Sequence, residues 1–204
     1  NIYHTLPLEF TNKFSTIEQK WFDNYLNLHK DTIFHANLFL LDDNFLDILK
    51  HQKAYEIIRK YNIRRFSFDI GPCYRKCTTK NNKFYGTGNR LNINEIYEII
   101  ENKITFLKKN LPAQCEIAVE NLNYYSTGAY ETVCEAEFYN DICKKYDLGL
   151  VLDIPHVQAT VYNKKMALSE YLTGLGIFHV REIHLSKMKV LNHNEAVDYH
   201  DKPG

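Results

Sequence analysis

The sequence predicts an α/β fold in which parallel strands form a barrel of the (β/α)8 TIM type. Short apolar runs typical of strands alternate with longer segments in which apolar residues recur at helical spacing. Several of these runs end in a carboxylate or an imidazole. Parallel strands of such a barrel direct their carboxyl ends to one face, where active sites lie. We therefore favour a barrel over a doubly wound sheet, which requires a glycine-rich turn directly after its first strand.

The expected elements follow one another along the chain in alternation. Strands are predicted at 32–40, 64–70, 115–120, 149–154 and 180–185. Helices are predicted from a capping box beginning at Ser15, from Asp43 to about Asn62, and over 93–109, 135–146 and 165–173. The segment 71–92, with three glycines and two cysteines, is expected to be a long loop.

These five strands are fewer than the eight of a closed barrel. Residues 1–14 are too polar and too interrupted by proline to predict a strand, so the first strand is expected to be missing or degenerate. The chain ends four residues after His200. We expect a single barrel domain over residues 1–204 that is incomplete or truncated, or whose edges are covered by something else.

Composition is that of an ordinary globular protein of 204 residues with a formal net charge of zero. Zero net charge offers no global attraction to nucleic acid or to an anionic membrane. No apolar run approaches the roughly 20 residues of a membrane span, and the first residues do not resemble a signal peptide. Five scattered cysteines argue against a disulfide framework, and Cys73 and Cys77 have no second pair with which to form a zinc knuckle. We expect a cytoplasmic protein.

Potential metal ligands lie at or near the ends of the predicted strands. They are Glu120, Asp153, His156, His184, Asp198 and His200. Brought to one face, these groups repel one another unless cations lie between them, and a cluster of divalent metal ions is the simplest such cation. A sharp turn at Pro155 is expected to place Asp153 and His156 beside the same ion.

The ligand types leave two chemistries open. Imidazole and carboxylate ligands suit iron, which supports reactions with O2, and they equally suit zinc, which activates water for hydrolysis.

A family resemblance rests on a combination of motifs in the second half of the chain. These are Glu120-Asn121, the run YYSTGAYE at 124–131, LDIPH at 152–156 with Asn163 beyond it, EIHLS at 182–186, and DYHD at 198–201. In this combination the chain resembles the multinuclear non-haem iron-dependent oxidative enzymes, which include the methanobactin-biosynthesis oxidase. The resemblance covers roughly residues 32–204, is strongest from residue 115 onward, and implies a xylose-isomerase-like TIM barrel.

The resemblance also implies further site residues. A histidine at the end of the second strand falls on His35, and Asp69 stands where the family usually has a histidine. For Asp69, capping of a loop is an equal alternative to metal ligation. The family's last glutamate, on the eighth strand, has no counterpart in this chain. The implied cofactor is two or three iron ions of mixed valence, with zinc as the alternative, and Tyr124, Tyr125 and Tyr130 are candidates to line the substrate pocket.

The function implied by the resemblance is O2-dependent oxidation of a cysteine in a ribosomally synthesised peptide. The expected enzyme is thus a non-haem iron-dependent oxidoreductase that acts on a precursor peptide together with a peptide-recognition partner protein. Membrane and nucleic acid are not expected partners. The alternatives are an endonuclease-IV-like metallohydrolase, a sugar isomerase of the same superfamily, and a degenerate barrel used only for binding. Segment 121–136 lacks the glycine-rich run associated with endonuclease IV, which favours the oxidase.

Overall fold

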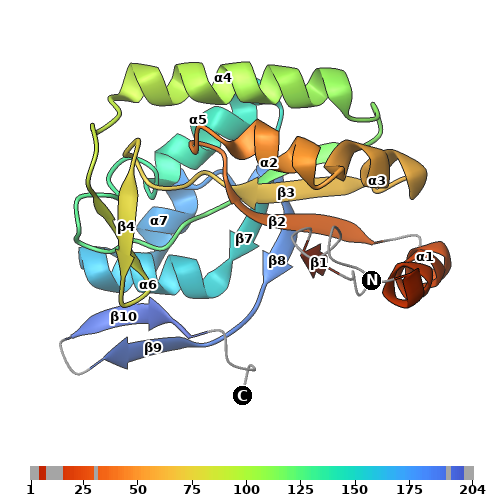
Figure 1. The fold of residues 1–204 in the computed structure, drawn as a ribbon. Coiled ribbons are helices and arrows are strands. Elements are labelled where there is room, and N and C mark those ends of the chain that lie inside the picture. Colours follow the sequence, from red (N-terminus) through yellow and green to blue (C-terminus); the bar gives the residue numbers. More distant parts are fainter. Residues whose placement is uncertain (1–4, 8–15, 30–31, 192–193, 200–204) are drawn as a thin grey trace.

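The computed structural model describes residues 5–7, 16–29, 32–191 and 194–199, and six parallel strands form its main sheet (Figure 1). In spatial order these are β1 (Thr5–Pro7), β2 (Ile33–Phe39), β3 (Arg65–Asp69), β6 (Glu116–Glu120), β7 (Gly149–Asp153) and β8 (Val180–His184). Two antiparallel hairpins stand apart from this sheet, β4 (Cys77–Lys80) with β5 (Lys83–Gly86), and β9 (Met188–Leu191) with β10 (Glu195–Asp198). The predicted parallel α/β arrangement is confirmed.

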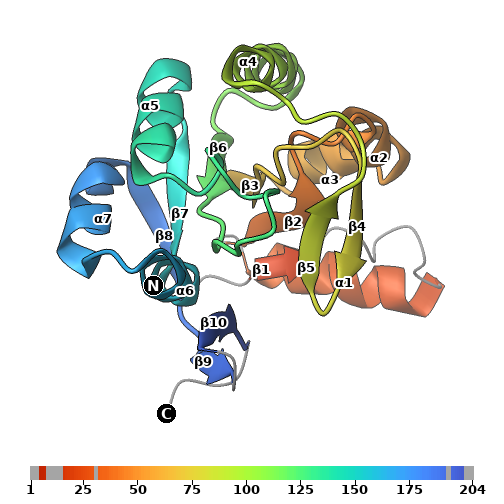
Figure 2. The same cartoon turned by 90° about the vertical axis from the view of Figure 1, so that its left-hand side faces the viewer.

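Helices connect the parallel strands. They are α1 (Thr16–Leu28), α2 (Phe45–His51), α3 (Ala54–Lys60), α4 (Ile93–Asn110), α5 (Ala136–Tyr146), α6 (Ile154–Lys164) and α7 (Leu168–Gly174), followed by a 3-10 turn at Ile177–His179. Figures 1 and 2 show α4 and α5 on one side of the sheet and the β9–β10 hairpin beneath α6. None of the described helices combines the length and apolar character of a membrane-spanning segment.

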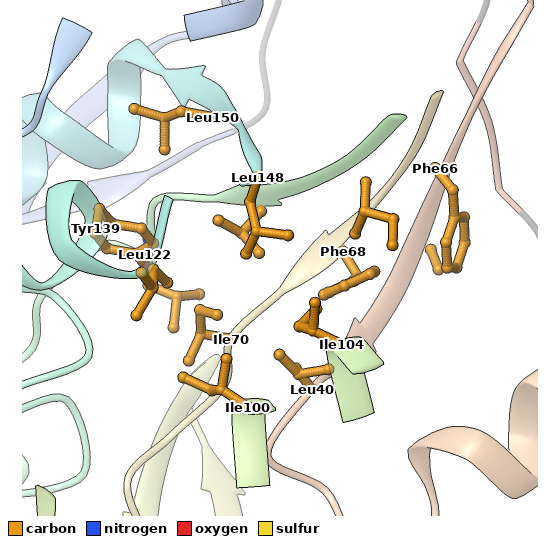
Figure 3. Close-up of a cluster of buried hydrophobic side chains, with 14 of the residues drawn as sticks. Leu40, Phe66, Phe68, Ile70, Ile100, Ile104, Leu122, Tyr139, Leu148 and Leu150 are labelled. Carbon is orange, nitrogen blue, oxygen red and sulfur yellow. Dashed lines mark hydrogen bonds between the residues drawn. The ribbon is translucent and has the colours of Figure 1, made fainter. Parts of the chain in front are cut away.

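The core lies between the sheet and its helices. Along β3, Phe66 and Phe68 alternate with polar residues and point toward the helices, as the two-residue period of a strand requires. From α4, Ile100 and Ile104 pack into the same cluster of buried side chains (Figure 3). The start of α4 is fixed by Asn92, whose side chain accepts hydrogen bonds from the first turn in a complete capping box. This packing fixes the position of β3 against α4.

The opposite face of the sheet is polar, and the sheet curves so that side chains from distant strands on this face lie close together. His35 on β2 and His184 on β8 have ring centroids 5.5 Å apart, although β3, β6 and β7 lie between their strands. In a flat sheet that separation would be about 19 Å, at roughly 4.8 Å per strand. The sheet is therefore strongly curved, and this polar face lines the inside of the partial barrel.

Several local predictions were wrong. A strand, β1, does form within 1–14 and pairs in parallel with β2. The single helix expected from Asp43 to Asn62 is two helices, because Lys53 between them adopts a left-handed conformation with φ of 53°. The segment 71–92, expected to be a loop, contains the β4–β5 hairpin. Helix α6 was not predicted, and the expected 165–173 helix is α7. Ser15 lies outside the described residues.

Candidate metal centre

The carboxyl ends of four strands bring their last side chains together. Asp69 ends β3, Glu120 ends β6, Asp153 ends β7 and His184 ends β8. The strand register pairs Asp69 with Glu120 and Asp153 with His184. The three carboxylates are almost completely buried. Buried carboxylates require cations or strong hydrogen-bond donors close by, so this end of the barrel is a strongly polar site inside the protein.

Glu120 lies at the centre of the site and faces two groups of side chains. Its Oε2 is 3.3 Å from Nε2 of His35 and 3.3 Å from Nδ1 of His184, whereas its Oε1 is 3.5 Å from Nδ1 of His156. Two triads, His35 with Asp69 and Glu120, and Glu120 with Asp153 and His156, each place their ligand atoms within 4.8 Å of one another. Each triad suits one metal ion. Glu120 belongs to both, as a carboxylate bridging two ions would.

Asp198 reaches the site from the β9–β10 hairpin. Its Oδ2 is 3.5 Å from Nε2 of His156, and its Oδ1 accepts a hydrogen bond of 3.0 Å from the Ser186 hydroxyl. Asn163 on α6 fixes the hairpin, because its amide group bonds both the N–H and the C=O of Ala196, at 2.8 and 2.9 Å. Residues far apart in the sequence thus meet at one centre.

Each site histidine has one ring nitrogen within hydrogen-bond distance of a group outside the proposed ligand set. His156 Nδ1 lies 2.8 Å from the carbonyl oxygen of Asn121, which can only accept, so Nδ1 carries a proton and Nε2, which faces Asp198 Oδ2 at 3.5 Å, is the nitrogen that could bind a metal ion. His184 Nε2 lies 2.8 Å from Glu182, and His35 Nδ1 lies 3.0 Å from the Ser67 hydroxyl. Histidine ligands of metals are characteristically held through their other nitrogen in this way.

Asp153 has a second task at the start of α6. It is the N-cap residue, and its Oδ1 accepts a hydrogen bond of 2.7 Å from the backbone N–H of His156. Pro155 lies in the first turn of the helix, where a missing N–H costs nothing. The expected sharp turn at Pro155 is therefore wrong. A helix N-terminus brings Asp153 and His156 together instead.

Asn121 connects the ends of β6 and β7. Its side chain, fully buried, accepts from the Asp153 N–H at 2.8 Å and donates to the Asp153 carbonyl at 3.1 Å. An amide side chain that bonds both backbone groups of one residue acts like an added strand segment, and it fixes Asp153 relative to Glu120. Neither Asn121 nor Glu182 was predicted as a site residue, although each lies within a motif that carried the family resemblance.

The electrostatics follow from burial and crowding. Burial raises the pKa of Asp69 well above its ordinary value, and the adjacent Glu120 raises it further. Although burial opposes it, hydrogen bonds to Glu120 and Glu182 raise the pKa of His184 to about 10. Burial also opposes protonation of His156, but Asp198, Asp153 and Glu120 raise the pKa to about 9. Cationic imidazoles thus offset the carboxylates, which is the charge that divalent metal ions would supply.

A cavity of about 410 Å³ opens beside this centre. His35, Asp69, Glu120, His156 and Asp198 form one wall, and Phe39, Phe84, Tyr125 and Tyr130 form an aromatic wall. Of the three tyrosines predicted to line a pocket, Tyr124 is not part of this lining, and its hydroxyl lies 3.4 Å from Glu131. His200 lies outside the described residues. The remaining predicted ligands, including Asp69, are brought together.

Comparison with solved structures identifies the fold. A xylose isomerase domain containing protein from Salmonella typhimurium LT2 superposes with a TM-score of 0.58 and 12% identity, over 90% of this chain and 60% of that one. D-Psicose 3-epimerase from Clostridium cellulolyticum H10 gives a TM-score of 0.55 and 13% identity, over 89% and 62%. At these identities the likeness shows the fold alone, which is the predicted xylose-isomerase-like TIM barrel, present here in part.

Sequence comparison finds two curated relatives, both described as UPF0276 proteins. The one from Psychromonas ingrahamii is 31% identical over 90 residues, which are 43% of this chain and 32% of the relative. The one from Rhizobium meliloti (strain 1021) is 28% identical over 115 residues, or 54% and 33%. The chain thus spans about a third of the length of these relatives.

The family assignment comes from residues 92–203, more than half of the chain, which match the model of a single enzyme family. This stretch contains Glu120, Asp153, His156, His184 and Asp198, the residues on which the resemblance was based. The protein belongs to the MbnB/TglH/ChrH family of RiPP precursor modification enzymes.

Proposed function

We propose that the protein oxidises a cysteine of a ribosomally synthesised precursor peptide, using O2 and iron ions held at the carboxyl end of the barrel. The observation that carries this proposal is the position of Glu120, whose two carboxylate oxygens face two different groups of imidazoles and carboxylates. Membership of a family that modifies RiPP precursors supports a peptide as substrate. The residues proposed to hold metal are His35, Asp69, Glu120, Asp153, His156, His184 and Asp198, together with His200.

The donor set fits iron. Mixed imidazole and carboxylate ligands are those of non-haem iron sites, and the described donors include no thiolate that would favour a closed structural zinc site. When bound, iron supplies the redox chemistry by which O2 oxidises the substrate thiol. Zinc is the alternative occupant, since the same donors accept it.

The cavity beside the centre is the proposed substrate site. One wall consists of the proposed ligands and the other of Phe39, Phe84, Tyr125 and Tyr130, so a side chain entering the cavity has the metal on one side and an aromatic surface on the other. All five cysteines of the chain lie within the described residues, and none lines this cavity. The oxidised thiol is therefore assigned to the peptide. A partner protein that binds the rest of the peptide is part of the proposal.

The test combines metal analysis with peptide mass. Protein reconstituted anaerobically with ferrous iron should retain at least two ions per chain, with iron retained over zinc. It is then exposed to O2 with its partner and a cysteine peptide encoded beside its gene. A change in peptide mass that requires both O2 and the cysteine is expected. Replacing the peptide cysteine with serine should abolish that change.

A matched pair of variants controls for folding. Glu120→Gln should lose metal and peptide oxidation together. Glu98→Gln removes an exposed carboxylate of α4 and should retain both. Wild-type protein that holds zinc alone and cleaves abasic DNA or isomerises a sugar would overturn the oxidase in favour of the hydrolase or isomerase.

A further inference from the structure

Glu182 is a carboxylate of the barrel interior, two residues before His184 on β8 and outside the proposed ligand set. Its side chain is 7% exposed. One oxygen, Oε1, lies 2.8 Å from Nε2 of His184. The other, Oε2, is buried without a hydrogen-bond partner among the described residues and lies 3.6 Å from Nη1 of Arg65. Keeping this carboxylate inside the protein has an energetic cost, which the chain bears at a position adjacent to its metal centre.

The contact with Glu182 determines which nitrogen of His184 faces the centre. A carboxylate accepts, so Nε2 of His184 is the donor and carries a proton. The ring is thereby turned so that Nδ1 lies 3.3 Å from Glu120 and 3.9 Å from Asp153. Rotating the imidazole by half a turn about Cβ–Cγ would put Cδ2 in the place of Nδ1 and Cε1 in the place of Nε2, and it would break the bond to Glu182. Glu182 therefore selects one of two ring orientations.

Arg65 fixes Glu182 from the opposite side of the barrel. Its Nη2 and Nε both lie 2.8 Å from Oε2 of Glu116, and its Nη1 donates to the carbonyl of Arg181 at 3.0 Å. With three nitrogens engaged, the guanidinium has little freedom, and its charge lies beside Glu182 Oε2. The Arg65–Glu182 contact thus joins β3 and β8 through the barrel interior, although β6 and β7 lie between them in the sheet. Glu182 in turn contacts His184, a proposed metal ligand.

We propose that Glu182, held by Arg65, is a positioning residue that presents Nδ1 of His184 to the metal centre and strengthens its electron donation. The inference rests on the proposed metal centre but not on the identity of the metal or the substrate. An imidazole that donates its other N–H to a carboxylate is a more basic ligand, and loss of such an outer contact typically costs about 10–100-fold in metal affinity.

The experiment titrates metal-free protein with ferrous iron anaerobically, and separately with Co²⁺ as a spectroscopic probe. Glu182→Ala should weaken binding of the ion next to His184 about 10–100-fold. Glu182→Gln retains an oxygen that accepts from Nε2 but lacks the charge, so it should lose less affinity. Glu98→Gln removes an exposed carboxylate of α4 that takes no part in the contacts of Arg65 or Glu182, and it should bind as wild type does.

A second measurement distinguishes positioning from general support of the fold. The hyperfine coupling of the His184 nitrogen in a paramagnetic derivative, and the reduction potential of the iron centre, should change in both Glu182 variants and not in Glu98→Gln. The reduction potential should rise, because a weaker donor stabilises the ferric state less. Circular dichroism of each metal-free variant identifies any that fails to fold, in which case Glu182→Gln provides the test.

The outcomes separate the two proposals. Wild-type affinity and spectra in folded Glu182→Ala and Glu182→Gln would overturn this inference, and so would equal losses in Glu98→Gln. Wild-type protein that binds metal with the predicted dependence on Glu182, yet leaves every cysteine peptide unchanged, would overturn the proposed function alone. Wild-type protein that binds no metal would overturn both.

Discussion

At the scale of single residues, Asp153 combines a structural role with a chemical one. It caps α6 through Oδ1, and it belongs to the second proposed metal triad. Replacing it with alanine removes both functions, and loss of an N-cap alone costs about 0.5–2 kcal/mol. Alanine at this position is therefore an ambiguous test of metal binding.

Asp153→Asn separates the two roles. Asparagine caps helices as well as aspartate does, so the free energy of unfolding of the metal-free protein should change little. Metal content should fall, because a neutral amide is a poor substitute for a carboxylate ligand. Urea denaturation and elemental analysis measure the two effects independently. Full metal occupancy in this variant would mean that Asp153 is not a ligand.

Gly71 occupies a position that other residues cannot adopt without strain. Its φ is +93°, and an added Cβ would lie 2.5 Å from Cβ of Phe39. Gly71→Ala should therefore destabilise the fold by about 1–3 kcal/mol. Phe39 lines the proposed substrate cavity, so the variant should also bind peptide more weakly. Unchanged thermal unfolding would show that the loop after β3 can relax.

At the scale of elements, the β9–β10 hairpin is held to α6 through the Asn163 amide. Asn163→Ala would leave the buried Ala196 N–H without its partner, at a cost of about 1–3 kcal/mol. Amide hydrogen exchange at Ala196 should accelerate, and metal affinity should fall because Asp198 lies on the same strand. Asn102→Ala, on the exposed face of α4, is the control and should change neither. An unaltered exchange rate at Ala196 would show that the Asn163 amide does not hold the hairpin.

The sequence predicted elements where periodicity was strong and missed those defined by turn chemistry. Strands β2, β3, β6, β7 and β8 were predictable, because each is a short segment that contains β-branched or aromatic residues and stands between segments of different periodicity. Helix α6 was missed because Pro155 was interpreted as a helix breaker, although proline favours the first helical turn. The β4–β5 hairpin turns at Asn81 and Asn82, both with positive φ, and two adjacent asparagines are a typical signal for such a turn.

At the scale of the whole molecule, the site joins strands, a helix and a hairpin that are distant in the sequence. An ion that binds only the folded protein, at one hundred times its dissociation constant, stabilises it by about 2.7 kcal/mol. For a chain of this size that corresponds to a rise of about 5–10 °C in melting temperature. Differential scanning calorimetry with and without a chelator should show this difference, and Glu120→Gln should abolish it. A chelator-independent melting temperature would contradict a bound metal centre.

The interior contacts could not have been predicted from the sequence. The proximity of Arg65 and Glu182 depends on how strongly the sheet curves and on an irregular register between β7 and β8. Neither property is encoded in local periodicity. The clustering of the strand-end side chains, by contrast, could be predicted from the rule that parallel strands end at one face. The family resemblance added His35 and Asp69.

The aspartates of the site have a consequence for denticity. Asp153 and Asp198 each have Oδ1 engaged by a protein donor, the His156 N–H and the Ser186 hydroxyl. These hydrogen bonds favour Oδ2 of each aspartate as the oxygen that would hold a metal ion. Asp153 and Asp198 would then supply fewer donor atoms to an ion than two bidentate carboxylates would, which would leave more room for exogenous ligands at the centre.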